Sequence, residues 1–236
     1  MEKFVCKNIQ FNLIYEPIEN IRENSGLFET KFEQEFPSKL NILPDFGDGA
    51  PLDIPKITGN TEEYGLNVSK VNSSISRKVK SDVCPKVALE EFKIVIDKLY
   101  EIVNEVSQNK ILFCGITLDL DYSLADGINA TEFITNKYLN KSNIKNLYDV
   151  ATKFTYVKDD KYYVNYFFSN FRKNKDVSDV ISIQIDINDK FRFNSAGGNK
   201  SYSDCKISET LYNMALSVIN KDLNDILENS GENVGN

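Results

Sequence analysis

An amphipathic helix that runs directly into an apolar strand, within residues 85–126, constrains this chain more than any other feature. Its apolar side chains recur at the i, i+3, i+4 spacing of a helix with one apolar face: Phe92, Val95, Ile96, Leu99, Tyr100, Val103 and Val106. After the polar Ser107-Gln108-Asn109, residues 111–116 are apolar on both faces, and apolar and polar residues then alternate through Leu118 and Leu120. The pattern predicts a central strand that is covered by a helix.

The remaining segments supply strands to flank this one and helices to cover it. Period-two alternation predicts strands at residues 9–15, 40–43, 64–68, 71–79, 154–157, 162–171, 177–187 and 191–193. Helical spacing predicts helices at residues 18–36, 130–139, after Ser142 and from Ser208. Residues 45–61 hold several glycines and prolines, which predicts a loop.

These elements indicate an α+β fold with a largely antiparallel sheet and helices packed mainly on one face. The first half follows the ferredoxin-like β-α-β-β-α-β order, and the second follows α-β-β-β-β-α. We expect a single domain over residues 1–236, with 1–127 and 128–228 as its alternative division into halves and 229–236 as a disordered tail. No internal repeat is evident in the residues themselves.

Composition excludes several classes of function. The chain contains no histidine, which excludes Ser-His-Asp and Cys-His catalysis and imidazole-ligated metals. A net charge of −7 argues against a general binder of nucleic acid or of anionic membranes. The four cysteines lie far apart, and the sequence shows neither a signal peptide nor an apolar run of membrane-spanning length. We therefore expect a cytoplasmic protein without a cofactor or a membrane partner.

An aromatic hairpin at residues 153–175 is the first candidate site. In its second strand, Tyr162, Val164, Tyr166 and Phe168 are predicted to face one way, and Tyr163, Phe167 and Phe171 the other. A strand that is apolar on both faces has to be covered on both, either by its own chain or by a partner. The residues predicted to form an interface are Tyr162, Tyr163, Tyr166, Phe167 and Arg172. The alternatives are a purely structural core strand and a surface that stacks single-stranded nucleic acid.

Three aspartates form the second candidate. Asp119 and Asp121 share one face of the central strand, and Asp126-Gly127 follows at its end. Carboxylates in this arrangement could hold Mg²⁺, which predicts a metal-dependent enzyme acting on a phosphorylated substrate. The other interpretation is that these aspartates form the solvated side of a half-buried strand.

The layout resembles a sporadically distributed family of uncharacterised prokaryotic proteins. The similar features are Tyr15-Glu16-Pro17-Ile18, Glu35-Phe36-Pro37, and Leu89-Glu90-Glu91-Phe92 in a helix that leads to the strand at 111–122. The family carries a basic-aromatic-Asn pattern on that strand, whereas this chain departs from it with Thr117-Leu118-Asp119-Leu120-Asp121. The resemblance implies no activity, and it favours a bacterial or phage-encoded accessory protein.

We therefore expect a non-enzymatic interaction protein that self-associates or binds a protein partner. An accessory subunit of a prokaryotic defence or toxin-immunity system is the role we predict from composition and resemblance. The alternative is the metal-dependent enzyme that uses Asp119, Asp121 and Asp126.

Overall fold

The computed structural model describes residues 4–44, 47, 49–125, 127–139, 147–171, 179–196 and 202–228. Its centre is a nine-stranded sheet in the order β2-β3-β4-β5-β1-β6-β9-β8-β7, in which every neighbouring pair is antiparallel. The strands are β1 (Phe4–Tyr15), β2 (Asn41–Ile42), β3 (Ile57–Asn60), β4 (Tyr64–Val68), β5 (Asn72–Lys78), β6 (Ile111–Ser123), β7 (Ala151–Lys158), β8 (Tyr162–Phe171) and β9 (Val180–Asn188).

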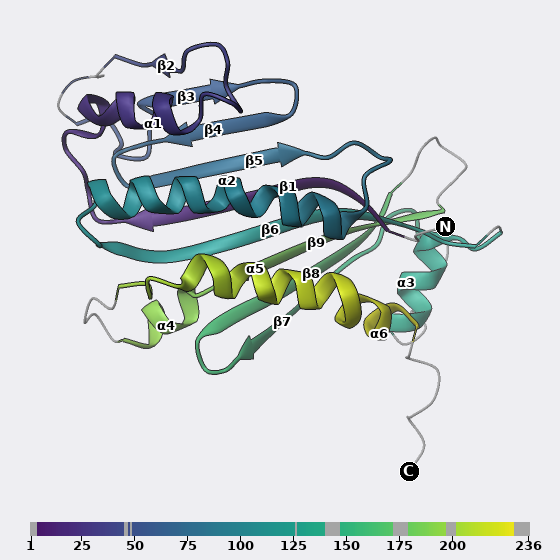
Figure 1. Ribbon diagram of the computed structural model, residues 1–236. Helices are drawn as coiled ribbons and strands as arrows, with labels where there is room; N and C mark the ends of the chain where they lie inside the picture. The colour runs from purple at the N-terminus through teal and green to yellow at the C-terminus, as the bar shows by residue number, and fades with distance from the viewer. Residues whose placement is uncertain are drawn as a thin grey trace.

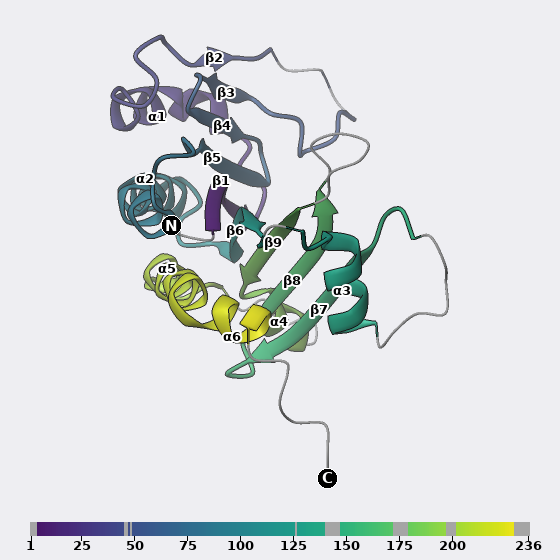
Figure 2. The ribbon, with the colours of Figure 1, turned by 90° about the vertical axis from the view of Figure 1, so that its right-hand side faces the viewer.

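Long helices cover one face of this sheet, which confirms the predicted α+β class. The helices are η1 (Ile21–Asn24), α1 (Ser25–Lys31), α2 (Pro85–Val106), α3 (Ala130–Tyr138), α4 (Lys190–Ser195), α5 (Ile207–Ser217), the π-helical turn η2 (Val218–Asp222) and α6 (Leu223–Glu228). Helix α2 packs on β1 and β5, α5 packs on β6 and β9, and the two helices lie side by side (Figures 1 and 2). Within the described residues, no helix combines the length and the apolar content needed to cross a membrane.

The core lies between these helices and one side of each strand. Strand β6 alternates as predicted, so that Ile116, Leu118 and Leu120 are buried while Thr117 and Asp119 face the side without the long helices, here called the open face. Short helix α4 is the exception among the helices: Phe193 packs on Phe113 of the open face.

The structure corrects four local predictions. The ferredoxin-like order is met only in outline, because the segment between the first two helices forms four strands and β1 is flanked by antiparallel β5 and β6. The predicted loop 45–61 contains β3, where main-chain pairing with β4 outweighs the glycine at 59. Residues 191–193 lie in α4 and not in a strand. The predicted helix 18–36 is shorter, and it consists of η1 and α1. The helix predicted after Ser142 falls partly outside the described residues.

An internal two-fold relation organises the sheet, although no repeat is obvious in the sequence. Each half begins with a central strand (β1 or β6), continues through a helix (α1 or α3), forms an antiparallel meander (β2–β5 or β7–β9), and ends in a helix that covers the central strand (α2 or α5–α6). Strand β3 therefore corresponds to β7, β4 to β8, and β5 to β9. The first half has one additional strand, β2, at its outer edge.

The registers align the halves residue by residue. Buried Ile9, Phe11, Leu13 and Tyr15 of β1 correspond to Ile116, Leu118, Leu120 and Tyr122 of β6, and the pair Gln10–Thr117 lies at the local two-fold axis. The backbone hydrogen bond from Val79 N to Lys7 O (2.9 Å) has its counterpart in the bond from Asp189 N to Cys114 O (3.1 Å). The halves meet where β1 pairs with β6.

Candidate interaction surface

The β7–β8 hairpin forms one outer edge of the sheet. Its turn contains Asp159-Asp160 as predicted, but Lys161 also lies between the strands, since Lys158 pairs with Tyr162; both aspartates have positive φ (54° and 51°), and Lys161 N donates to Lys158 O (3.1 Å). Aspartate tolerates this left-handed conformation better than most residues, and such turns match the twist of the flanking strands.

The alternation predicted for β8 is confirmed. Val164, Tyr166 and Phe168 are buried beneath the helices, whereas Phe167 and Phe171, on the open face, are 40% and 48% exposed. In β8, a partner can therefore contact Phe167 and Phe171 but not Val164, Tyr166 or Phe168.

The structure corrects one predicted interface residue. Tyr166 is 2% exposed, and its ring stacks on Phe168 (centroids 6.2 Å apart), so the ring belongs to the core. Burial also raises the pKa of the Tyr166 hydroxyl. Of the other predicted residues, Tyr162 and Tyr163 are half-buried, and Phe167 is exposed. Arg172 lies outside the described residues.

Strand β7 contributes the exposed residues that the sequence reasoning missed. Phe154, Tyr156 and Val157 are 40%, 41% and 39% exposed, although all three lie in a regular strand. Their sequence signal was present, because the three residues form an apolar cluster within the strand, but which strand lies at an edge depends on sheet order. We define the β7 edge surface as these three residues together with Phe167 and Phe171 of β8.

Rings of this surface continue an aromatic ladder that begins in the core. Tyr156 stacks on Tyr166 (6.2 Å between centroids), and Phe154 contacts Tyr138 of α3 (5.2 Å) and Phe168 (6.1 Å). Core packing fixes the inner rings, Tyr166 and Phe168. These in turn hold the outer rings, Phe154 and Tyr156, in place, so binding costs little conformational entropy. A rigid aromatic edge is typical of an energetically important contact.

The two aspartates of the metal hypothesis already have protein partners. Asp119 accepts hydrogen bonds from Asn8 Nδ2 (3.2 Å) and Gln184 Nε2 (2.9 Å). The carboxylate of Asp121 lies 3.2 Å from Lys7 Nζ. Asp126 lies outside the described residues, within which no group of three potential metal-binding side chains occurs. The metal-dependent reading stays a prediction, and these contacts give it no support.

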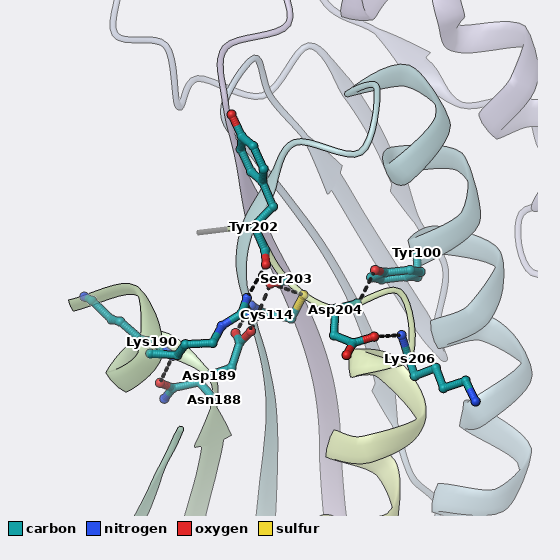
Figure 3. Close-up of polar contacts among 10 residues, drawn as sticks. Tyr100, Cys114, Asn188, Asp189, Lys190, Tyr202, Ser203, Asp204 and Lys206 are labelled. Carbon is teal, nitrogen blue, oxygen red and sulfur yellow. Dashed lines mark hydrogen bonds and ion pairs between the residues drawn. The ribbon is translucent and has the colours of Figure 1, made fainter. Parts of the chain in front are cut away.

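A second polar cluster surrounds Asp189, which is 1% exposed (Figure 3). Its carboxylate accepts hydrogen bonds from Cys114 N (2.7 Å) and Ser203 Oγ (2.9 Å), and Arg192 lies 3.4 Å away. Burial raises the pKa of Asp189 and raises that of the Cys114 thiol well above its usual value. A thiol held in its neutral form is a poor nucleophile. The cluster therefore ties β6, α4 and the segment before α5 together, and its thiol is not activated as a nucleophile.

The described residues also line a cavity of about 290 Å³ at the start of α2, bounded by Phe4, Cys84, Pro85, Lys86, Ile219, Asn220 and Asn224. Its polar groups are one lysine, one thiol and two amides, which do not by themselves specify a ligand. Of these candidate sites, the β7 edge surface is the one whose exposed side chains best define a kind of partner.

Comparison with known proteins adds no family to this description, since no protein-family model matches the chain and no curated protein has a significantly similar sequence.

Proposed function

We propose that the protein is a non-enzymatic interaction protein that binds another polypeptide through the β7 edge surface. The observation that carries this proposal is the exposure of Phe154, Tyr156 and Val157, each about two-fifths, on an eight-residue strand at the edge of the sheet. Phe154 and Tyr156 project from the helix-covered face of the edge strand and Val157 from the open face, so exposed apolar groups flank the strand on both sides, where an added strand would contact them.

Edge position adds a second source of affinity. One side of an edge strand presents main-chain N–H and C=O groups in a row, and an added strand satisfies them while side-chain pockets provide specificity. Natural edges that are meant to stay unpaired are short, charged or interrupted by proline. Strand β7 is long, has lysines only at residues 153 and 158, and contains no proline.

The cellular setting belongs to the same proposal. An accessory or recognition subunit of a prokaryotic defence or toxin-immunity system would use such a surface, and this part of the proposal rests on composition and on the family resemblance.

A pair of matched substitutions tests the proposal. Tyr156→Lys places a charge within the β7 edge surface, and Ile94→Lys places the same charge on α2, where Ile94 is 63% exposed. We expect Tyr156→Lys to weaken association at least about tenfold, because a contact residue at an interface is worth on the order of 1.4 kcal/mol or more. Ile94→Lys should bind as the unmodified chain does.

Two measurements report the result: sedimentation velocity for self-association, and co-purification with the products of neighbouring genes expressed in the same cells. Circular dichroism establishes that both variants are folded. If Tyr156→Lys associates as strongly as Ile94→Lys in both assays, the proposal is wrong.

A further inference from the structure

We infer that the polypeptide bound at the β7 edge surface is a second copy of this chain, paired antiparallel through β7 about a two-fold axis at Thr155. This inference rests on the proposed function and names its partner. The two sheets would join into one continuous sheet across the axis.

The direction of the main chain in β7 defines what an added strand can contact. Asn170 N donates to Val150 O (3.3 Å), immediately before β7. Antiparallel pairing alternates, so the main-chain groups of residues 152, 154 and 156 point toward β8. Those of Lys153, Thr155 and Val157 point outward, and no described strand pairs with them.

The first half of the molecule shows what occupies the corresponding position. Strand β3 is the counterpart of β7, and β2 pairs antiparallel with the outer side of β3, with Asn41 opposite Thr58 and Ile42 opposite Ile57. An antiparallel strand therefore covers this position once within the fold. A second β7 would supply the same kind of strand to the other half.

The sequence of β7 is complementary to itself in one register. With the axis at Thr155, Phe154 lies opposite Tyr156 of the second copy, Lys153 lies opposite Val157, and Thr155 meets its own counterpart. Aromatic and threonine pairs of this kind stabilise antiparallel sheets, and no like charges face each other. The register also extends the aromatic ladder across the axis, since Phe154 and Tyr156 are its outermost rings.

Neighbouring registers fit less well. An axis at Phe154 would bring Asp149 opposite Asp159 of the second copy, so that two like charges would meet twice. An axis at Tyr156 would leave only residues 154–158 paired and would place Phe154 opposite Lys158. The Thr155 register instead brings Asp149 toward Lys161.

Local charge permits the pairing of two copies. The whole chain carries a net charge of −7, which would make two copies repel each other over most of their surfaces. Residues 151–161 are an exception, because their three lysines outnumber their two aspartates. Two copies can therefore approach each other through β7 without strong electrostatic repulsion.

Mixed cysteine cross-linking tests the register. Phe154→Cys and Tyr156→Cys are made in a background in which the two cysteines that are not buried are replaced, Cys84→Ser and Cys205→Ser. In the proposed pairing residues 154 and 156 form a non-hydrogen-bonded pair, whose Cα atoms are about 4.5 Å apart, within the range that a disulfide spans. On oxidation, the mixture of the two variants should give at least about ten times more covalent dimer than either alone. Phe154→Cys or Tyr156→Cys dimerising alone would overturn the register, and no cross-link in any mixture would overturn the second-copy inference.

The hydrogen-bonding contribution is tested without removing an aromatic ring. Thr155→Pro deletes an outward N–H, and Thr155→Val keeps that N–H while removing the hydroxyl, which donates to Asn165 Oδ1 (2.8 Å). In sedimentation equilibrium, we expect Thr155→Val to remain dimeric and Thr155→Pro to dissociate at least about tenfold more readily.

The outcomes separate the two proposals. If the unmodified chain is monomeric at all concentrations, the second-copy inference is wrong. The rate of hydrogen exchange at the β7 amides, rapid or slow, does not change that conclusion. The proposed function then still stands if Tyr156→Lys abolishes capture of a different protein. A dimer that persists unchanged in Thr155→Pro and Tyr156→Lys overturns the inference and places the interface elsewhere.

Discussion

Strands β3 and β7 occupy equivalent places in a duplicated architecture, yet their outer sides differ. In the first half, β3 is covered on its outer side by β2, and Phe36 and Leu40 pack directly over Gly59. In the second half the residue that corresponds to Gly59 is Phe154, whose own ring fills the space and remains 40% exposed. The equivalent strands are thus paired with β2 in one half and left at the edge of the sheet in the other.

This difference shows that the accessibility of a strand depends on which side chains and segments pack against it, and not only on its position in the topology. At Gly59 the side chains of Phe36 and Leu40 lie directly over the strand backbone, whereas at Phe154 the ring itself packs against Tyr138 of α3 and stays partly exposed. Substitutions at equivalent positions in the two halves therefore test the comparison directly.

The largest effect is expected at Asp189, which corresponds to Val79 of the first half. Asp189→Ala leaves Cys114 N–H, the Ser203 hydroxyl and Arg192 without their common partner, and it should lower the free energy of unfolding by about 3 kcal/mol, because each unsatisfied buried group costs about 1–3 kcal/mol. Val79→Ala, which removes only apolar contacts, should cost about 1 kcal/mol. Urea denaturation at pH 7 measures both values, and equal losses would show that Asp189 acts only by filling space.

The contribution of Asp189 should also depend on pH. Burial raises its pKa in the folded protein above the unfolded value, so the folded state binds the proton more tightly. The proton-linked part of the stabilisation is complete below the unfolded pKa and is lost as pH rises through the folded pKa, while the hydrogen bonds from Cys114 N and Ser203 Oγ contribute at both pH values. The difference in unfolding free energy between the unmodified chain and Asp189→Ala should therefore be greater at pH 4 than at pH 7. A difference that grows with pH would contradict this assignment.

An intermediate effect is expected at Gly59. A Cβ added there would lie 2.7 Å from Leu40 Cδ2 and 2.8 Å from Phe36 Cδ1, so Gly59→Val should destabilise the protein by about 2 kcal/mol through overpacking. Because β3 is already paired with β2, association measured by sedimentation should be unchanged once the variant is folded. A gain in association would mean that displacement of β2 opens a second binding edge.

The smallest effect is expected at Asp119 on the open face. Asp119→Asn keeps an oxygen that can accept a hydrogen bond from Gln184 or Asn8, so stability should change by less than about 1 kcal/mol. Isothermal titration with millimolar Mg²⁺ should give the same heat for this variant and for the unmodified chain. Saturable heat that disappears in Asp119→Asn would revive the metal-dependent alternative.

The sequence predicted the central elements well because their signals are local. The helical spacing of Phe92, Ile96 and Leu99 and the alternation around Leu118 predicted α2 and β6 without knowledge of what they contact. The side-chain directions in β8 followed from alternation in the same way. These patterns reflect burial of one face, which a single segment records in its own residues.

Sheet order and accessibility were not recoverable in this way. The burial of Tyr166 and the exposure of Phe154 depend on which strands are neighbours and on where α3 lies, and both are long-range properties. The internal relation left only a short trace, Ile-x-Phe-x-Leu-x-Tyr at residues 9–15 against Ile-x-Leu-x-Leu-x-Tyr at 116–122. Alignment of those two strands identifies β1 and β6 as equivalent, but it does not give the order of the other strands.

The pairing of β1 with β6 has a consequence for how the protein unfolds. Each half contributes its own central strand to the other half's core, and helices α2 and α5 pack together above the seam. Cleavage of the connection 107–110 would leave each fragment with an unpaired, exposed apolar strand, β1 in one and β6 in the other. We therefore expect neither fragment to fold in isolation. We expect thermal melting to be one concerted event, and the two separated fragments to regain structure only when mixed.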